Sequence, residues 1–226
     1  MSDKKQKIER NLKAIVYAFE KFSQSFQKGK TSDELFSVFT DALSESLGEY
    51  EILYDYIWGK DSINIDGETD KNYVPKDGDT VIMDISVGKD GVWCDICRTY
   101  FVGEPSAEQK KIYNLIRDSI KMAEKSLKVG SCAEDVYKSA NEPYQKESLE
   151  LVHHAGHKIG ESNLLQPQFL MDNKTKIEDN KFYTIESGLY NGFGIRLEND
   201  YYVGEDETEN MFEPIMSLDI ENYILN

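Results

Sequence analysis

Cysteine, histidine and proline are scarce in this chain, and it has no long apolar run. Its 226 residues include three cysteines, three histidines and five prolines. An odd number of cysteines cannot all pair, so a secreted disulfide scaffold is not expected. A membrane helix needs ~20 consecutive apolar residues, and the polar first residues do not resemble an apolar signal core. We therefore expect a cytoplasmic protein that does not insert into a membrane.

Cationic residues are also too few to balance the acids. The 42 acidic residues outnumber the 26 lysines and arginines, which leaves a formal charge of −16. A surface of this sign repels phosphate backbones and anionic lipid heads, so nucleic acid is not an expected partner, whereas cations are. The 39% hydrophobic and 12% aromatic residues are enough for a packed core, which excludes a disordered chain.

Two of the cysteines, Cys94 and Cys97, form one CxxC pair. They lie in a strand-like run over 92–100, where residues three apart point to opposite faces. A redox pair normally opens a helix, and a zinc knuckle needs a second pair. The spacing is therefore interpreted as incidental.

The first half of the chain shows two helical patterns followed by strand-like runs. Apolar residues recur with helical period over about 5–27, and a second helix follows with Thr31 or Ser32 as its cap. Runs rich in β-branched and aromatic residues then follow, with a turn signal at 88–91. These runs cover 51–58, 81–87 and 91–101.

The second half repeats this order. Ser106 and Gln109 form a capping box for a helix that ends near Leu127, and another helix is expected over 132–147. Strand-like runs follow at 181–187, 194–203 and 211–216. A shift of 101 positions places Gly29 on Gly130, which supports a repeat. We expect one α+β domain over 1–226, built from halves of about 1–103 and 104–226 whose helices pack on a shared, curved antiparallel sheet.

Pairs of carboxylates occupy matching hairpins in the two halves. Asp84 and Asp95 are equidistant from a turn at Lys89 and Asp90, which predicts direct cross-strand neighbours. Glu186 and Glu198 are likewise symmetric about Gly192. Two like charges at such positions cost stability unless a cation lies between them. All four carboxylates converge if the halves pack about a pseudo-twofold axis.

The three histidines, His153, His154 and His157, fall within five residues of one another. In an extended segment His153 and His157 share a face, and His154 points the other way. Taken alone, such a cluster is more often a hydrogen-bonded structural group, and the acids alone could form a solvated face. Their joint occurrence favours a metal site of Mn, Co, Fe or Zn type, with enough acids for two ions.

Five segments of the chain, taken in order, resemble the signature of the pita-bread metallopeptidases of family M24. They are Gly78–Asp84, Cys94–Tyr100, His153–Gly160, Thr184–Tyr190 and Gly194–Asn199. The family includes methionine aminopeptidase, Xaa-Pro aminopeptidase and prolidase, and the later segments are most similar to the Xaa-Pro and prolidase branch. The resemblance covers a catalytic domain without the extra N-terminal domain of full-length Xaa-Pro aminopeptidases.

The resemblance implies a pita-bread fold and a peptidase whose attacking water is activated by a dinuclear metal centre. It places the ligands of two divalent ions, with manganese favoured, on Asp84, Asp95, His157, Glu186 and Glu198. In this set Asp95 and Glu198 would bridge the ions, and Glu186 would also be the general base. Tyr190 and Arg196 match residues that brace the ligand carboxylates. A peptide is the implied substrate, and the resemblance is compatible with a homodimer.

Two histidines usual in the family are absent here. One would stand seven residues after the ligand histidine, where this chain has Leu164, and the other near Asp66 and Gly67. Such residues hold the substrate carbonyl, and loss of one donor costs ~10² to 10³ in rate. The first hypothesis is a weakly active Xaa-Pro peptidase in which His153 supplies the remaining imidazole. The alternatives are a metal-binding module without turnover and a different hydrolysis or creatinase-like reaction.

Overall fold

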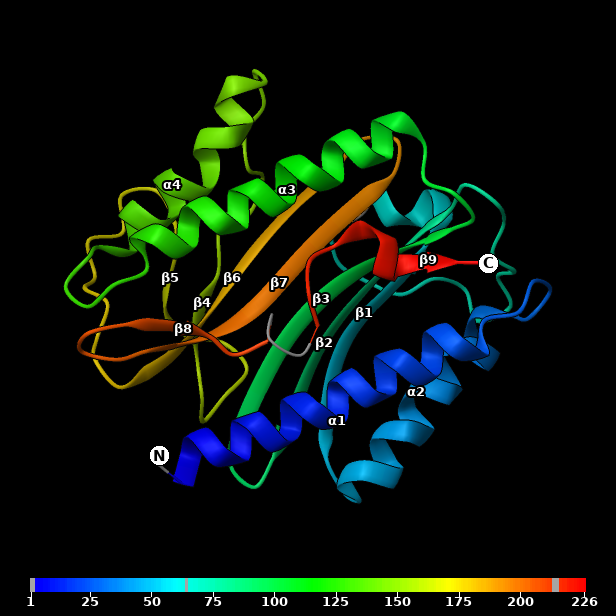
Figure 1. Ribbon diagram of the computed structural model, residues 1–226, viewed down its shortest axis with the longest axis horizontal. Coiled ribbons are helices and arrows are strands. Elements are labelled where there is room, and N and C mark those ends of the chain that lie inside the picture. The colour runs from blue at the N-terminus through cyan, green and yellow to red at the C-terminus, as the bar shows by residue number, and fades with distance from the viewer. Residues whose placement is uncertain (1–2, 64, 213–215) are drawn as a thin grey trace.

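Each half of the chain contributes a pair of helices and a sheet to the computed structural model, which describes residues 3–63, 65–212 and 216–226 (Figure 1). The helices of the first half are α1 (Asp3–Ser25) and α2 (Ser32–Leu47). Those of the second half are α3 (Ala107–Ser126) and α4 (Ala133–Lys146). All four predicted helices are present, and within the described residues none of them is both long and apolar enough to cross a membrane.

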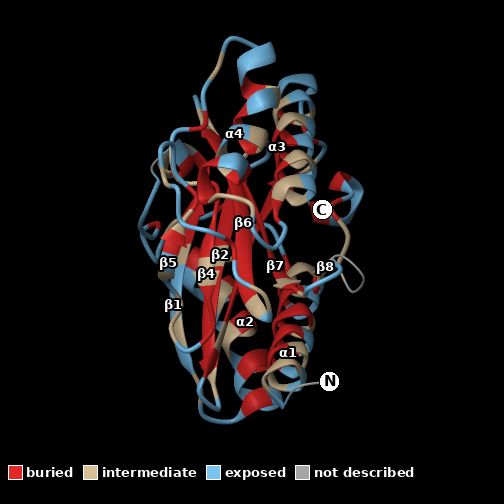
Figure 2. Ribbon diagram, turned by 90° about the vertical axis from the view of Figure 1, so that its left-hand side faces the viewer, coloured by how far each residue is buried: buried red, intermediate tan, exposed pale blue. Residues whose placement is uncertain are grey.

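Local sequence explains where these helices begin and which side they bury. Thr31 caps α2 through a capping box with Glu34, and Ser106 caps α3 in the same way with Gln109. The apolar stripe of α1 is buried against the sheet layer, where Phe19 and Phe22 pack on Tyr100. Seen from the side, α1 and α3 lie along one face of the largely buried strands (Figure 2).

The strands form two sheets. The first has the order β1-β2-β3-β9 and the second the order β5-β4-β6-β7-β8. The strands of the first sheet are β1 (Glu51–Trp58), β2 (Thr80–Lys89), β3 (Val92–Val102) and β9 (Ile224–Leu225), with β9 parallel to β3. Those of the second are β4 (His157–Ile159), β5 (Leu165–Gln168), β6 (Lys181–Tyr190), β7 (Gly194–Val203) and β8 (Thr208–Asn210). Two short 3₁₀ turns, Gly59–Ile63 and Ile220–Tyr223, complete the described elements.

The strand expected over 211–216 is not found where the chain is described. Met211 and Phe212 form a buried bend, residues 213–215 lie outside the described part, and the pairing strand β8 ends just before them. Met211 and Phe212 are therefore apolar because they are buried, and they do not form a strand.

The two sheets meet along β3 and β7, which lie side by side in the middle of the molecule (Figure 1). The hydroxyl of Thr99 donates to the carbonyl of Arg196 over 2.8 Å and accepts from its backbone N–H over 2.9 Å. The buried guanidinium of Arg98 donates to the carbonyl of Glu198 and to Oδ1 of Asn199, both over 2.7 Å. Side chains therefore join the halves where the expected shared sheet divides in two.

The register of the first acidic hairpin differs from the expected one. Asp90 and Gly91 form the two-residue turn with φ of 53° and 77°, so the turn lies one residue later than predicted. Asp84 therefore faces Cys97, and Asp95 faces Ser86. The two acids are diagonal neighbours on one face, and the expectation that they are directly opposite is wrong. In the second hairpin Glu186 does face Glu198, as the symmetry about Gly192 predicts.

Candidate active site

The two hairpins and the histidine segment bring the predicted ligands to one pocket. This pocket has a volume of about 330 Å³. Its lining includes all five residues that the family resemblance indicates as ligands, namely Asp84, Asp95, His157, Glu186 and Glu198. They come from β2, β3, β4, β6 and β7, so both halves of the chain contribute.

Three of these residues form the tightest group. Ligand atoms of Asp95, His157 and Glu198 all lie within 4.8 Å of one another. His157 Nε2 is 3.6 Å from Asp95 Oδ2 and 3.9 Å from Glu198 Oε1, too far for hydrogen bonds. Within the described residues, the buried Asp95 Oδ1 and Glu198 Oε1 accept no hydrogen bond. Buried acceptors without partners are costly, so these atoms fit a bound cation.

The pKa shifts of these three residues and the tautomer of His157 agree with a cation site. Burial, together with the neighbouring carboxylates, raises the pKa of Asp95 and of Glu198 well above the usual range. Burial lowers the pKa of His157, so its imidazole is neutral near pH 7. His157 Nδ1 lies 3.1 Å from the carbonyl of Lys158, which assigns the proton to Nδ1 and leaves Nε2 as the ligand atom.

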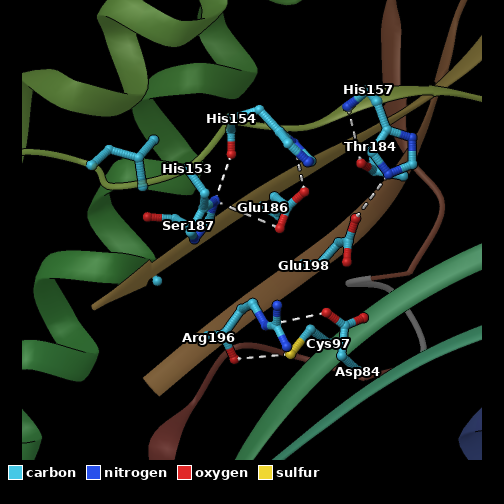
Figure 3. Close-up of polar contacts among 12 residues, drawn as sticks. Asp84, Cys97, His153, His154, His157, Thr184, Glu186, Ser187, Arg196 and Glu198 are labelled. Carbon is cyan, nitrogen blue, oxygen red and sulfur yellow. Dashed lines mark hydrogen bonds and ion pairs between the residues drawn. The ribbon is translucent and has the colours of Figure 1, made fainter. Parts of the chain in front are cut away.

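Asp84 is held by a buried arginine. Arg196 Nε is 3.1 Å from Asp84 Oδ2 (Figure 3). Arg196 Nη2 is 3.0 Å from Asp55 Oδ2. Burial raises the pKa of Asp84 to about 7 although the charge of Arg196 opposes the shift. Asp55 lies directly opposite Asp84 on β1 and was missed at the sequence level. The available signal was an acid between two tyrosines, inside a run rich in aromatic and β-branched residues.

Tyr190, the other predicted bracing residue, makes no such contact. Its hydroxyl is buried and has no hydrogen-bond partner in the described part of the chain. Its ring centroid lies 6.0 Å from that of His153. Of the pair, Arg196 touches a predicted ligand and Tyr190 packs beside a histidine.

Glu186 lies beside two histidines, and the nearer one is His154, whereas His153 was expected. His154 Nδ1 is 2.8 Å from Glu186 Oε1, whereas His153 Nδ1 is 3.7 Å from Oε2 (Figure 3). His154 lines the pocket and His153 does not. The expectation that His154 points away is wrong, because residues 152–156 do not form an extended strand. Burial favours a raised pKa for Glu186, but the close contact with His154 and the charges of the histidines outweigh it and lower the pKa to about 2.

A glycine allows the histidine segment to approach β6. Gly156 has φ of +127°, and a Cβ there would lie 2.1 Å from the carbonyl oxygen of Thr184. The N–H of Glu186 donates to the carbonyl of Ala155 over 3.2 Å, which fixes the segment against the strand. The position of the imidazoles therefore depends on a backbone conformation that other residues rarely adopt.

The family resemblance leads us to expect two further histidines, at Leu164 and near Asp66, and these positions fall differently about the pocket. Asp66 lines it, whereas Leu164 is 47% exposed and does not, although its neighbour Asn163 does. Gly67 donates its N–H to Asp55 Oδ1 over 2.9 Å, which places the loop carrying Asp66 beside the site. The histidines of the chain stand at 153, 154 and 157.

The CxxC pair does not form a site. Cys94 Sγ contacts the carbonyl of Ile8 in α1, and Cys97 Sγ lies 3.4 Å from the carbonyl of Arg196. Both thiols are free, buried and directed to opposite faces of β3, as the strand periodicity predicts.

Comparisons with known proteins agree with the fold and identify the family. The model of metallopeptidase family M24 matches residues 6–205. An uncharacterized peptidase of Methanocaldococcus jannaschii is 30% identical over 204 residues, which are 79% of this chain and 56% of that protein. A Xaa-Pro dipeptidase of Lactobacillus helveticus is 31% identical over 130 residues, 56% of this chain and 35% of that protein. The chain thus spans about half the length, or less, of these curated relatives.

Solved structures show the same architecture. The X-Pro aminopeptidase of Thermotoga maritima has a TM-score of 0.86 at 24% identity, covering 92% of this chain and 60% of that one. The prolidase of Pyrococcus furiosus has a TM-score of 0.87 at 21% identity, covering 94% of this chain and 64% of that one. These likenesses confirm the pita-bread fold of mixed α and β structure. With the family model matching most of its length, the chain belongs to metallopeptidase family M24.

Proposed function

We propose that the chain is a metal-dependent peptidase that hydrolyses the bond between an N-terminal residue and proline. The observation that carries this proposal is the buried cluster of Asp95, His157 and Glu198, in which one oxygen of each carboxylate has no hydrogen-bond partner among the described residues. Relatives named as Xaa-Pro dipeptidase and X-Pro aminopeptidase support the substrate class.

The five pocket residues would hold two divalent ions, of which manganese is the favoured metal. Asp95 and Glu198 would be shared, Asp84 would serve one ion, and His157 with Glu186 would serve the other. Divalent ions in such a site polarise the scissile carbonyl and acidify the attacking water. The matching donor types, carboxylates with one neutral imidazole, suit these metals.

Glu186 is the proposed general base. It is ionised at neutral pH, and His154 contacts Oε1. A carboxylate with a pKa of about 2 is a weak base, so Glu186 would act as a base only on a water whose pKa bound ions would lower. His153 does not line the pocket, so its proposed contribution to catalysis runs through Glu186.

The rim of the pocket suits the N-terminal residue of a peptide. Asp55 and Asp66 attract a cationic amino terminus to the pocket. Leu53 and Tyr54, both exposed on β1, offer an apolar surface beside it. The pocket thus combines acids for the amine with apolar contacts for the first side chain.

A substrate panel tests the proposal. The metal-free protein, reloaded with Mn²⁺, is assayed with Xaa-Pro dipeptides, Xaa-Pro-Yaa tripeptides and Met-Xaa dipeptides. We expect Mn²⁺-dependent release of proline or of a Pro-Yaa product, abolished by a chelator. Cleavage of Met-Xaa alone, or cleavage that survives the chelator, would contradict the assignment.

A second candidate is a metal-binding module without turnover. The exposed Leu164 and the pocket-lining Asp66, at positions where the family carries histidines, favour this function. It predicts that calorimetry detects binding of Mn²⁺ and of an Xaa-Pro peptide while prolonged incubation yields no product. If the chain is a peptidase, the same mixture should yield product.

A further inference from the structure

His154 lines the pocket, yet the proposed chemistry gives it no task. It is the most exposed of the imidazoles that contact Glu186, with 26% of its side chain accessible against 10% for His153. Its ring lies 5.6 Å, centroid to centroid, from that of His157. His154 therefore stands between the base and the open pocket.

The nearest contact between His154 and Glu186 joins Nδ1 to Oε1. These atoms are 2.8 Å apart, and among the described residues Nδ1 has no partner in hydrogen-bond geometry. A rotation of the ring that turns the Nδ1 proton toward the carboxylate would close a hydrogen bond, with Oε1 as its acceptor. The other oxygen, Oε2, lies 3.7 Å from His153 Nδ1, beyond hydrogen-bond distance. Of the two oxygens of Glu186, Oε1 thus has the closer imidazole.

We propose that His154 is a positioning residue that fixes Glu186 through Oε1 and keeps Oε2 free for an ion or a proton. The inference rests on the proposed function, because it assigns His154 a role at the same site. A carboxylate on a flexible stem loses rotamer freedom when it is ordered, and a hydrogen bond made in advance removes that cost from ion binding.

The test compares His154→Ala and His154→Asn with the wild-type chain. Val152→Ala, a change at a 58% exposed residue of the same segment, is the matched control. Loss of a partner that orients a ligand typically costs 10- to 100-fold in metal affinity, so we expect about that loss of Mn²⁺ affinity by calorimetry in His154→Ala. Its kcat should fall while KM changes little. Asn can place an N–H near the position of Nδ1, so His154→Asn should recover part of both losses.

A measurement without metal keeps the inference separate from the peptidase proposal. NMR of the metal-free protein should show a downfield, slowly exchanging Nδ1 proton of His154 that is lost in Glu186→Ala. If His154→Ala folds poorly, the Asn variant and this resonance carry the test.

The outcomes separate the two proposals. Wild-type Mn²⁺ affinity and kcat in His154→Ala, or no such resonance, would overturn the role of His154 and leave the peptidase assignment standing. The resonance together with no hydrolysis by the wild type would instead overturn the peptidase and leave the pairing standing.

Discussion

At the scale of single residues, the candidate metal site is marked by buried carboxylate oxygens that have no hydrogen-bond partner among the described residues. Protein interiors rarely leave such atoms unsatisfied, because desolvation of a charge costs several kcal/mol. Asp95 Oδ1 and Glu198 Oε1 are unsatisfied among the described residues, while Asp84 and Glu186 each contact a cationic or imidazole group. The unpaired atoms therefore mark where we expect a cation to bind and to stabilise the fold.

Removing this pair should abolish the response of the fold to metal. A ligand that binds only the native state adds RT ln(1 + [L]/Kd), about 2.7 kcal/mol at one hundred times Kd. The melting temperature of the wild type should therefore rise with Mn²⁺, and that of Asp95→Asn/Glu198→Gln should not. The surface double variant Glu161→Gln/Glu178→Gln controls for the change in charge and should respond like the wild type. Equal responses of the site variant and the wild type would disprove the assignment.

The pKa of Asp84 predicts how the metal-free protein responds to pH. Burial raises it to about 7, so the folded state holds this proton more firmly than the unfolded chain does. The contribution of Asp84 to the free energy of unfolding is therefore fully present below pH about 4 and is lost as the pH rises through about 7. In chelator, Asp84→Asn should gain stability relative to the wild type over this range. Urea unfolding at each pH measures the difference, and parallel pH curves for the two proteins would contradict it.

At the scale of elements, the sequence predicts those features that are determined by residues close together in the chain. The helices, the capping box of Ser106 with Gln109 and the symmetric hairpin of Glu186 with Glu198 all follow from local patterns. The first hairpin was misplaced by one residue, because the strands continue to Lys89 and only Asp90 and Gly91 adopt positive φ.

The histidine segment could not be placed from local pattern. Ala155 and Gly156 exchange backbone hydrogen bonds with Phe169, and Gly156 packs against Thr184. These tertiary contacts bend the segment and turn His154 into the pocket. Successive side chains point to opposite faces only where the backbone is extended, and residues 152–156 do not form a strand.

The cap of α3 gives a prediction at this scale. Ser106 accepts the N–H of Gln109, and its loss leaves that donor without its partner. Ser106→Ala should lower the free energy of unfolding by about 0.5 to 2 kcal/mol, measured in urea. Ser106→Asp retains a capping oxygen and should stay near the wild type. If the Ala and Asp variants are equally destabilised, the cap is not the cause.

At the scale of the whole molecule, the site exists because two halves meet. Arg98 and Thr99 on β3 join the first half to β7 of the second, and Glu198 and Arg196 are the residues they contact. The repeat of helix pairs and acidic hairpins was visible in the sequence, and so was the family signature. The bridging side chains and the role of Asp55 in holding Arg196 appear only when the halves are assembled.

The most direct test of the central claim measures kcat/KM on an Xaa-Pro dipeptide for the wild type and for Glu186→Gln. Both proteins are loaded with Mn²⁺, their metal content is measured and their folding is checked by circular dichroism. Gln keeps an oxygen at the site but cannot take a proton, and loss of a general base typically costs 10² to 10⁴ in rate. We predict Mn²⁺-dependent hydrolysis by the wild type and a loss of about this size in the folded, metal-loaded variant. No hydrolysis by the loaded wild type, or equal rates in the two proteins, would contradict the account.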